Sequence, residues 1–199
     1  MTARERLVAA IAGQQVDQKP EIGWPVQGSD GLTYVEIDNP FGKALRKGVS
    51  LSGLLRRDVN DGEKALAEAA HEVRNDLINA VTKGPDVIVY KLYGADIIHN
   101  TPMEYGGHFL EVDRSILTVN DAPIIMLFVV GGPETFIDFV SDLPAQIFAW
   151  DVAGTGVSVS QVREMREGVL AAAAPDADIQ LVHPGDISPV IQIQHLANV

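Results

Sequence analysis

Apolar residues recur with helical spacing in the second quarter of the chain. Five of them stand three or four positions apart: Leu66, Ala70, Val73, Leu77 and Val81. This spacing places their side chains on one face of a helix. Asn60 or Asp61 can cap the start, and Lys83-Gly84-Pro85 is a stop signal. The pattern therefore predicts a helix from about Gly62 to Val81.

Another helix is predicted near the amino-terminal end. Thr2 and Glu5 have the spacing of a capping box, in which each side chain bonds the backbone amide of the other residue. Its apolar face consists of Leu7, Val8 and Ile11. Gly13 is suited to end this helix, because glycine adopts the left-handed conformation common after helices.

From residue 86 onward, runs that favour strands alternate with helical patterns. The predicted strands cover residues 86–93, 123–130, 145–152 and 178–183, and two weaker extended pieces cover 22–26 and 32–37. Predicted helices cover 104–118, the segment that begins at Gly131-Gly132-Pro133-Glu134, and a segment capped by Ser158 and Gln161. The run 168–174 is interpreted as the end of this last helix, stopped by Pro175.

This alternation predicts parallel βα units. The strands are continuously apolar, which a sheet covered on both faces requires. Neither G-x-G-x-x-G nor G-x-x-x-x-G-K-[ST] occurs, so the two common phosphate-binding loops are absent. A doubly wound sheet and a barrel both place their sites at the carboxyl ends of strands, and this pattern alone does not choose between them. Without an internal repeat or a low-complexity linker, residues 1–199 are interpreted as one domain.

Composition narrows the functional classes. The 199 residues carry a formal net charge of −12 and no cysteine. Thiol catalysis, disulfides and cysteine-ligated metals are thereby excluded, and no basic stripe is present for nucleic acid. No apolar run approaches the ~20 residues of a membrane span. The start, Met1-Thr2-Ala3-Arg4-Glu5-Arg6, lacks the apolar core of a signal peptide, so we expect a soluble, cytoplasmic protein.

The opening from Thr2 to Gly13 begins with a T-x-x-E-R motif on a helix and is followed by Val16-Asp17-Gln18-Lys19-Pro20, a V-D-x-x-P turn. This opening resembles that of the uroporphyrinogen decarboxylase superfamily, including its corrinoid methyltransferase branch. Residues 87–96 resemble its mid-barrel strand, and 123–132 resemble the strand that ends in H-x-C-G. Trp150-Asp151 and residues 185–189 resemble two later strand ends.

The resemblance implies an α/β fold of the (β/α) TIM-barrel type, truncated or irregular in its N-terminal third, because a complete barrel needs ~250 residues. It implies a decarboxylase (a lyase) or a methyltransferase that acts on or binds a tetrapyrrole, or a methylated, corrinoid-linked small molecule. Whether the chain is an enzyme is left open. A decarboxylase of this kind needs no cofactor, so we expect none.

The chain departs from this family at its chemical positions. The Arg-rich substrate motif is missing, and Lys91 stands where the family's strand carries an aspartate. Phe128-Val129-Val130-Gly131 stands where the methyltransferases place zinc-binding His and Cys. These losses favour an alternative, a non-catalytic binding or assembly subunit that keeps the scaffold.

Candidate site residues lie at the predicted strand ends. The proposed catalytic residues are Asp96, Asp151 and His183. The proposed substrate-binding residues are Tyr93, His99, Tyr105 and Asp186. Carboxylates and imidazoles are the usual general acids and bases near neutral pH. Capping of the turns after these strands is the competing structural role for Asp151 and Asp186.

A third hypothesis is a metal-dependent hydrolase. His99, Glu104 and His108 are spaced His-x₄-Glu-x₃-His, and two imidazoles with a carboxylate can hold a divalent metal.

An incomplete barrel also leaves open sheet edges. We therefore expect a homodimer, in which each chain completes the other's barrel.

Overall fold

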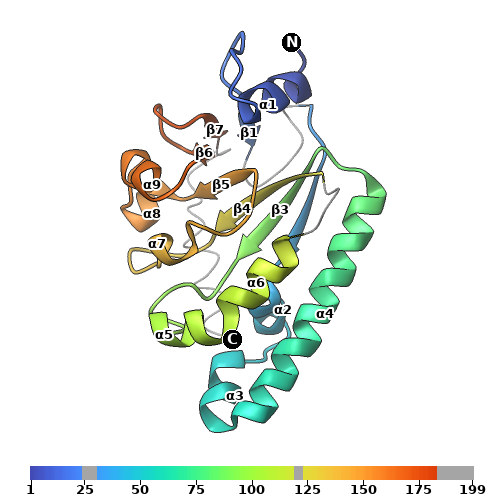
Figure 1. Ribbon diagram of the computed structural model, residues 1–199, viewed down its shortest axis with the longest axis vertical. Coiled ribbons are helices and arrows are strands. Elements are labelled where there is room, and N and C mark those ends of the chain that lie inside the picture. Colours follow the sequence, from blue (N-terminus) through green and yellow to red (C-terminus); the bar gives the residue numbers. More distant parts are fainter. Residues whose placement is uncertain (24–30, 119–122, 183–199) are drawn as a thin grey trace.

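The computed structural model describes residues 1–23, 31–118 and 123–182, which form a parallel sheet with helices packed on it (Figure 1). Seven strands are present in these residues: β1 (Glu21–Gly23), β2 (Tyr34–Asp38), β3 (Val87–Leu92), β4 (Ile124–Val129), β5 (Ile147–Trp150), β6 (Val169–Ala172) and β7 (Ile179–Val182). Every pair of neighbours runs parallel. The predicted parallel βα architecture is confirmed.

The strand order is that of a barrel opened at one seam. It runs β1-β7-β6-β5-β4-β3-β2, so only a β1–β2 pair would be needed to close the ring. Within the described residues, β1 pairs only with β7, and β2 only with β3. The sheet is thus a half-barrel, compatible with a partial TIM-barrel-like fold. Its irregular part is N-terminal, as expected, because β1 has only three residues.

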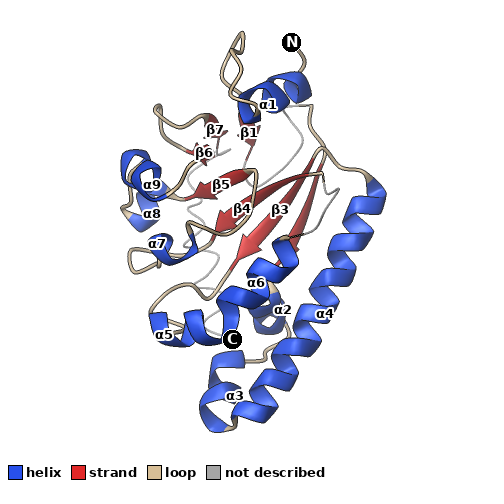
Figure 2. Cartoon of the chain, in the orientation of Figure 1, coloured by secondary structure: helices blue, strands red, loops and turns tan. Residues whose placement is uncertain are grey.

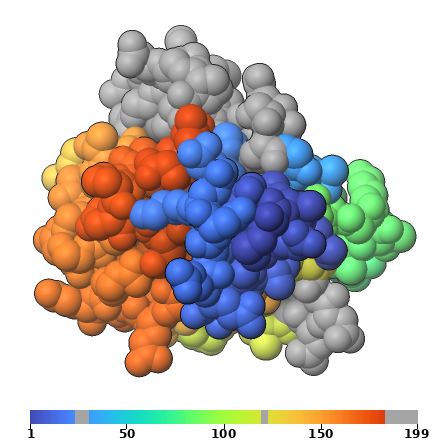
Figure 3. Space-filling model, turned by 90° about the horizontal axis from the view of Figure 1, so that it is seen from above, coloured from blue at the N-terminus to red at the C-terminus, as the bar shows by residue number. Residues whose placement is uncertain are grey.

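The helices occupy the connections (Figure 2). They are α1 (Ala3–Ile11), α2 (Pro40–Arg46), α3 (Leu51–Arg57), α4 (Val59–Lys83), α5 (Pro102–Glu104), the π-helix η1 (Tyr105–Phe109), α6 (Leu110–Leu117), α7 (Ile137–Val140), α8 (Val152–Thr155) and α9 (Val159–Met165). Seen from above, α1 lies between the C-terminal strands and α4 (Figure 3). None of the helices in the described residues combines the length and apolar character of a membrane span.

Local signals in the sequence account for several helix ends. The capping box of Thr2 and Glu5 is present, and so is that of Ser158 and Gln161. The long helix α4 starts slightly earlier than predicted, because Asp58 accepts hydrogen bonds from the two amides at 60 and 61. It ends at Gly84, whose φ of 65° suits glycine.

Two predicted helical segments were wrong. Residues 169–172 form strand β6, not a helix end, because helix α9 stops at Met165 and Gly168 turns the chain with a φ of 104°. Pro133 is not the first residue of a helix. The Gly131–Glu134 segment is a turn, and the short helix α7 begins only at Ile137.

Alternation along the strands separates two faces of the sheet. The Tyr90 hydroxyl on β3 reaches Asp113 on α6, so Tyr90 faces the helical layer. Lys91, the next residue, faces the opposite, concave side together with its register partners Asp38 and Phe128. Most of the concave face is buried and apolar. Lys91 therefore marks the place where this face becomes charged, near the carboxyl ends of the strands.

Candidate functional site

The loop after β3 is fixed by contacts with helix α2. Asn39, the N-cap of α2, accepts hydrogen bonds from the amides of Gly42 (2.9 Å) and Tyr93 (3.2 Å) and donates to the Tyr93 carbonyl (3.1 Å). Gly94 follows with a φ of 86°, and the Phe41 ring lies where its side chain would be, with carbons 2.7 Å from an added Cβ. Only glycine fits this position, so the direction of the next segment is tightly set.

This segment contains a carboxylate–imidazole pair, Asp96 and His99. The two Asp96 oxygens lie 2.8 and 3.0 Å from His99 Nδ1, and Oδ1 also accepts from the His99 amide at 3.1 Å. Asp96 is almost fully buried, whereas the His99 side chain keeps 14% of its surface exposed. Since Nδ1 donates to the carboxylate, Nε2 is the nitrogen left to accept a proton.

Further contacts position the His99 ring and its backbone. The ring packs edge-on against Phe41, with centroids 5.3 Å apart. The His99 carbonyl accepts from Arg56 at 3.2 Å, and the next residue, Asn100, donates to the Gly94 carbonyl at 2.7 Å. Within the described residues His99 Nε2 makes no hydrogen bond. The arrangement therefore resembles a general acid–base pair: a buried carboxylate orients an imidazole whose second nitrogen is left for another partner.

A charged network lies near the carboxyl ends of β2 and β3. Lys91 donates to Glu36 (2.7 Å) and lies 3.2 Å from Asp38. Arg46 on α2 also pairs with Asp38 and donates to the Tyr93 hydroxyl (3.2 Å). Burial, the largest single influence, lowers the pKa of Lys91, but the hydrogen bond with Glu36 and the nearby charges of Asp38 and Glu36 together raise the pKa above its ordinary value. Lys91 is therefore a fixed positive charge at neutral pH.

Sequence reasoning placed Tyr93 among the binding residues, and the structure puts its hydroxyl in this network. It missed Lys91, Asp38 and Arg46 as parts of one cluster. The signal was present, because Lys91 interrupts the otherwise apolar strand β3. A charge that is tolerated in a buried strand needs a partner on the neighbouring strand.

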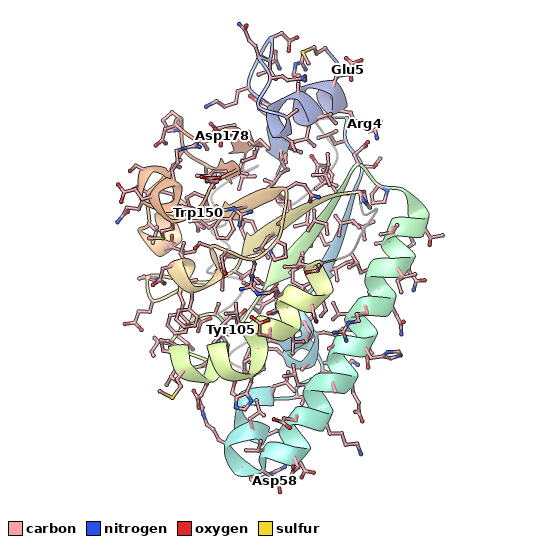
Figure 4. The ribbon with its side chains drawn as sticks, viewed as in Figure 1. Arg4, Glu5, Asp58, Tyr105, Trp150 and Asp178 are labelled. Atoms are coloured by element: carbon pink, nitrogen blue, oxygen red, sulfur yellow. The ribbon has the colours of Figure 1, made fainter. Side chains whose placement is uncertain are left out.

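Tyr105, predicted to bind substrate, lies on η1 beside α5 and α6 and is fully buried (Figure 4). Its hydroxyl donates to Asp113 at 3.0 Å, and Tyr90 donates to the other oxygen of the same carboxylate at 2.6 Å. Asn39 completes the cluster at 3.2 Å. Burial raises the pKa of Asp113 to about 6, against the hydrogen bonds that lower it. Tyr105 is thus part of a structural hub.

Asp151 lies at the carboxyl end of β5, two strands from β3 in the sheet. It is the N-cap residue of α8, and its carbonyl accepts from the Thr155 amide and hydroxyl at 2.9 and 2.7 Å. The position agrees with the predicted strand end, and the catalytic role remains a proposal. His183 and Asp186 lie outside the described residues.

The predicted metal site is not formed. Among the described residues, no group of three or more His, Asp or Glu side chains is arranged to hold a metal ion. Glu104 is bound by Arg56 at 2.7 and 2.9 Å, and it also caps α5. His99 is bound by Asp96. Positions 128 to 131 offer no zinc ligand either, since Phe128 is a buried residue of β4 and the chain has no cysteine.

Comparison with known proteins gives a likeness of fold. No protein-family model matches the sequence, and no curated protein sequence matches it. Among solved structures, a methyltransferase from Methanosarcina mazei superposes with a TM-score of 0.57 at 15% identity, over 82% of this chain and 48% of that protein. The chain thus spans about half the length of that protein. At this identity the similarity concerns the fold alone, and this chain shares its α/β, barrel-like architecture with that methyltransferase.

Proposed function

We propose that this chain binds a small methylated molecule at the carboxyl end of its sheet, with His99 as the group that exchanges a proton with it. The observation that carries the proposal is the Asp96–His99 pair: a buried carboxylate 2.8 Å from Nδ1 of a partly exposed imidazole. It lies at the strand end where sites of this architecture are built. The methyltransferase likeness supports the ligand class.

The residues define what each group does. Asp96 holds the His99 ring in one orientation and one tautomer through its contacts with Nδ1. Nε2 then accepts a proton from the bound molecule, or returns one to it. Next to the Tyr93 hydroxyl, the charges of Lys91 and Arg46 are balanced by Glu36 and Asp38. The donor set does not fit the zinc of the methyltransferase branch, so no step is assigned to a metal.

The test is a titration followed through the histidine side-chain resonances. Trimethylamine, dimethyl sulfide, a porphyrin and hydroxocobalamin are added separately to protein with labelled histidines. We expect saturable binding of a methylated probe that perturbs His99 and is lost in His99→Gln. His71→Gln is the matched control, because His71 lies exposed on α4 and bonds only its neighbour Asn75.

The other outcomes are equally informative. Binding of the macrocycles but not of the methylated probes would replace the ligand class by tetrapyrroles. Binding that persists in His99→Gln would move the site away from the Asp96–His99 pair. Absence of binding by all four probes would overturn the proposal and favour the assembly subunit.

The alternative function, a non-catalytic assembly subunit, is supported by strand β2, which lies at one edge of the sheet in the described residues. A groove of 480 Å³ runs beside this strand, between β2 and helices α2 and α4. We propose that a second copy of the chain covers this edge, as the open seam suggests. Light scattering on the purified protein tests it: a dimer that dissociates when Val35 is replaced by Arg supports the idea. A monomer at all concentrations would refute it.

A further inference from the structure

A small cavity lies between α3 and the α5–η1 segment. Its volume is 140 Å³, equal to roughly five water molecules at their volume in the liquid. Leu55 and Phe109 supply apolar walls, and Arg56, Glu104 and His108 supply the polar part. Such a space accommodates only a few heavy atoms. It is distinct from the Asp96–His99 pair, although Arg56 contacts the His99 carbonyl.

The hydrogen-bond acceptors around this cavity are already used. Glu104 Oε1 accepts from Arg56, and Oε2 accepts from Arg56 and from both the amide and the hydroxyl of Thr101. The Asn100 side-chain carbonyl accepts from the buried Ser52 hydroxyl at 2.6 Å. Arg56 neutralises Glu104, and its hydrogen bonds lower the pKa of that carboxyl to about 2. The carboxylate and amide oxygens that line the cavity therefore already accept hydrogen bonds.

In contrast, some hydrogen-bond donors at this cavity have no acceptor among the described residues. Arg56 uses Nε and Nη2 for Glu104 and the His99 carbonyl, while its Nη1 has no partner among the described residues. His108 packs on the Phe109 ring, and its ring nitrogens have no hydrogen-bond partner in the same part of the chain. One cationic guanidinium nitrogen and an imidazole on one cavity suit an anionic oxygen ligand.

The backbone that carries His108 is unusual in a way that fits a site. Residues 105–109 form a π-helix, in which the Leu110 amide bonds the Tyr105 carbonyl. Single π-helical turns are rare and recur at functional sites. The Phe139 ring packs where a Gly106 side chain would be, 2.8 Å from an added Cβ, so this turn is held in place from outside.

We propose that this cavity binds a small carboxylate of two or three carbons, held by Arg56 Nη1 and His108 with its alkyl part against Leu55 and Phe109. The small volume favours a short acid. Arg56 Nη1 can donate a charged hydrogen bond to the carboxylate, and the apolar walls favour an alkyl group over a fully hydrated inorganic anion. Of the three residues predicted to hold a metal, His108 thus contributes directly to this anion site, while Glu104 and the His99 carbonyl position Arg56.

The experiment titrates the protein with sodium acetate and sodium propionate while the imidazole resonances of His108 and His99 are followed separately. Sodium chloride at matched ionic strength, ethylammonium chloride and inorganic phosphate are the comparison probes. We expect saturable perturbation of His108 by the two carboxylates and none by ethylammonium or chloride. Because His108 and His99 are observed separately, this result is independent of the methylated-ligand proposal.

Variants locate the site. Arg56→Met should weaken carboxylate binding about tenfold or more, since it removes the charged hydrogen bonds. Arg57→Met is the matched control, because Arg57 is the exposed neighbour on the same helix and does not line the cavity. Leu55→Met keeps the apolar wall and should retain binding. Equal responses to chloride or ethylammonium, preference for phosphate, or unchanged affinity in Arg56→Met would each overturn the proposal.

Discussion

The buried carboxylate of Asp113 gives the sharpest prediction, because its charge opposes folding at neutral pH. It is fully enclosed and accepts hydrogen bonds from Tyr90, Tyr105 and Asn39. Burial raises its pKa to about 6, from an ordinary value of 3.8. Asp113→Asn keeps the shape and an acceptor oxygen but removes the charge. We expect this variant to gain stability, relative to wild type, as the pH rises.

The magnitude follows from proton linkage. Below pH 3.8 the carboxyl is protonated in both the folded and the unfolded chain. Between 3.8 and about 6 the folded chain binds more protons, so the free energy of unfolding falls as the pH rises. Well above pH 6 the carboxyl is ionised in both the folded and the unfolded chain, and the free energy of unfolding falls no further because of Asp113. The difference between the two pKa values, at about 1.4 kcal/mol per pH unit, amounts to about 3 kcal/mol.

The assay is urea unfolding of wild type and Asp113→Asn between pH 4 and 7.5, followed by circular dichroism. The sequence pI of about 4.7 lies within this pH range. The protein concentration is kept low, because proteins are least soluble near their pI. Carboxyls with lowered pKa, such as Asp17 and Glu104, change stability in the opposite direction. They are present in both proteins, so the difference between the two curves reports Asp113.

If the difference in free energy of unfolding between Asp113→Asn and wild type stays constant from pH 4 to 7.5, the reasoning is refuted. A difference that changes in favour of wild type as the pH rises would refute it as well. Tyr105→Phe serves as a second test. It removes one donor to the carboxylate, and these hydrogen bonds lower the pKa of Asp113. In this variant the decline in stability with rising pH should therefore extend to higher pH than in wild type.

Three further substitutions have defined outcomes. Arg166→Met removes three hydrogen bonds to backbone carbonyls of the α7–β5 connection and should lower the free energy of unfolding by about 2–4 kcal/mol, measured in urea. Gly94→Ala should destabilise more than Gly48→Ala, because both have positive φ but only Gly94 is blocked by the Phe41 ring; equal losses in thermal unfolding would contradict this contact. Lys91→Met leaves two carboxylates without their shared cation, so its stability should recover partly when the pH is lowered and they are protonated; a pH-independent loss would show that only packing was removed.

The carboxylate–imidazole pair shows how far residue types alone can lead toward a site. Asp96 and His99 were both candidates, and their separation of three residues permitted contact in a tight turn. The network of Lys91, Asp38 and Arg46 was not found, because Lys91 lies on a strand that is distant in sequence from both Asp38 and Arg46. The hydrogen bond of Tyr105 to Asp113 was not predicted, because the sequence does not show which side chain a buried tyrosine hydroxyl will meet.

The sequence by itself determined the elements whose signals are local. Helix α4, the capping boxes of α1 and α9, and the apolar strands β3, β4 and β5 follow from spacing, caps and turns within a few residues. Strand β6 was missed because Val169–Ala172 is rich in alanine, a strong helix former, and becomes a strand only between β5 and β7. The tertiary structure alone decided the order β1-β7-β6-β5-β4-β3-β2 and the partners of each charge. Pairing between distant strands depends on burial of whole faces, and no local pattern encodes it.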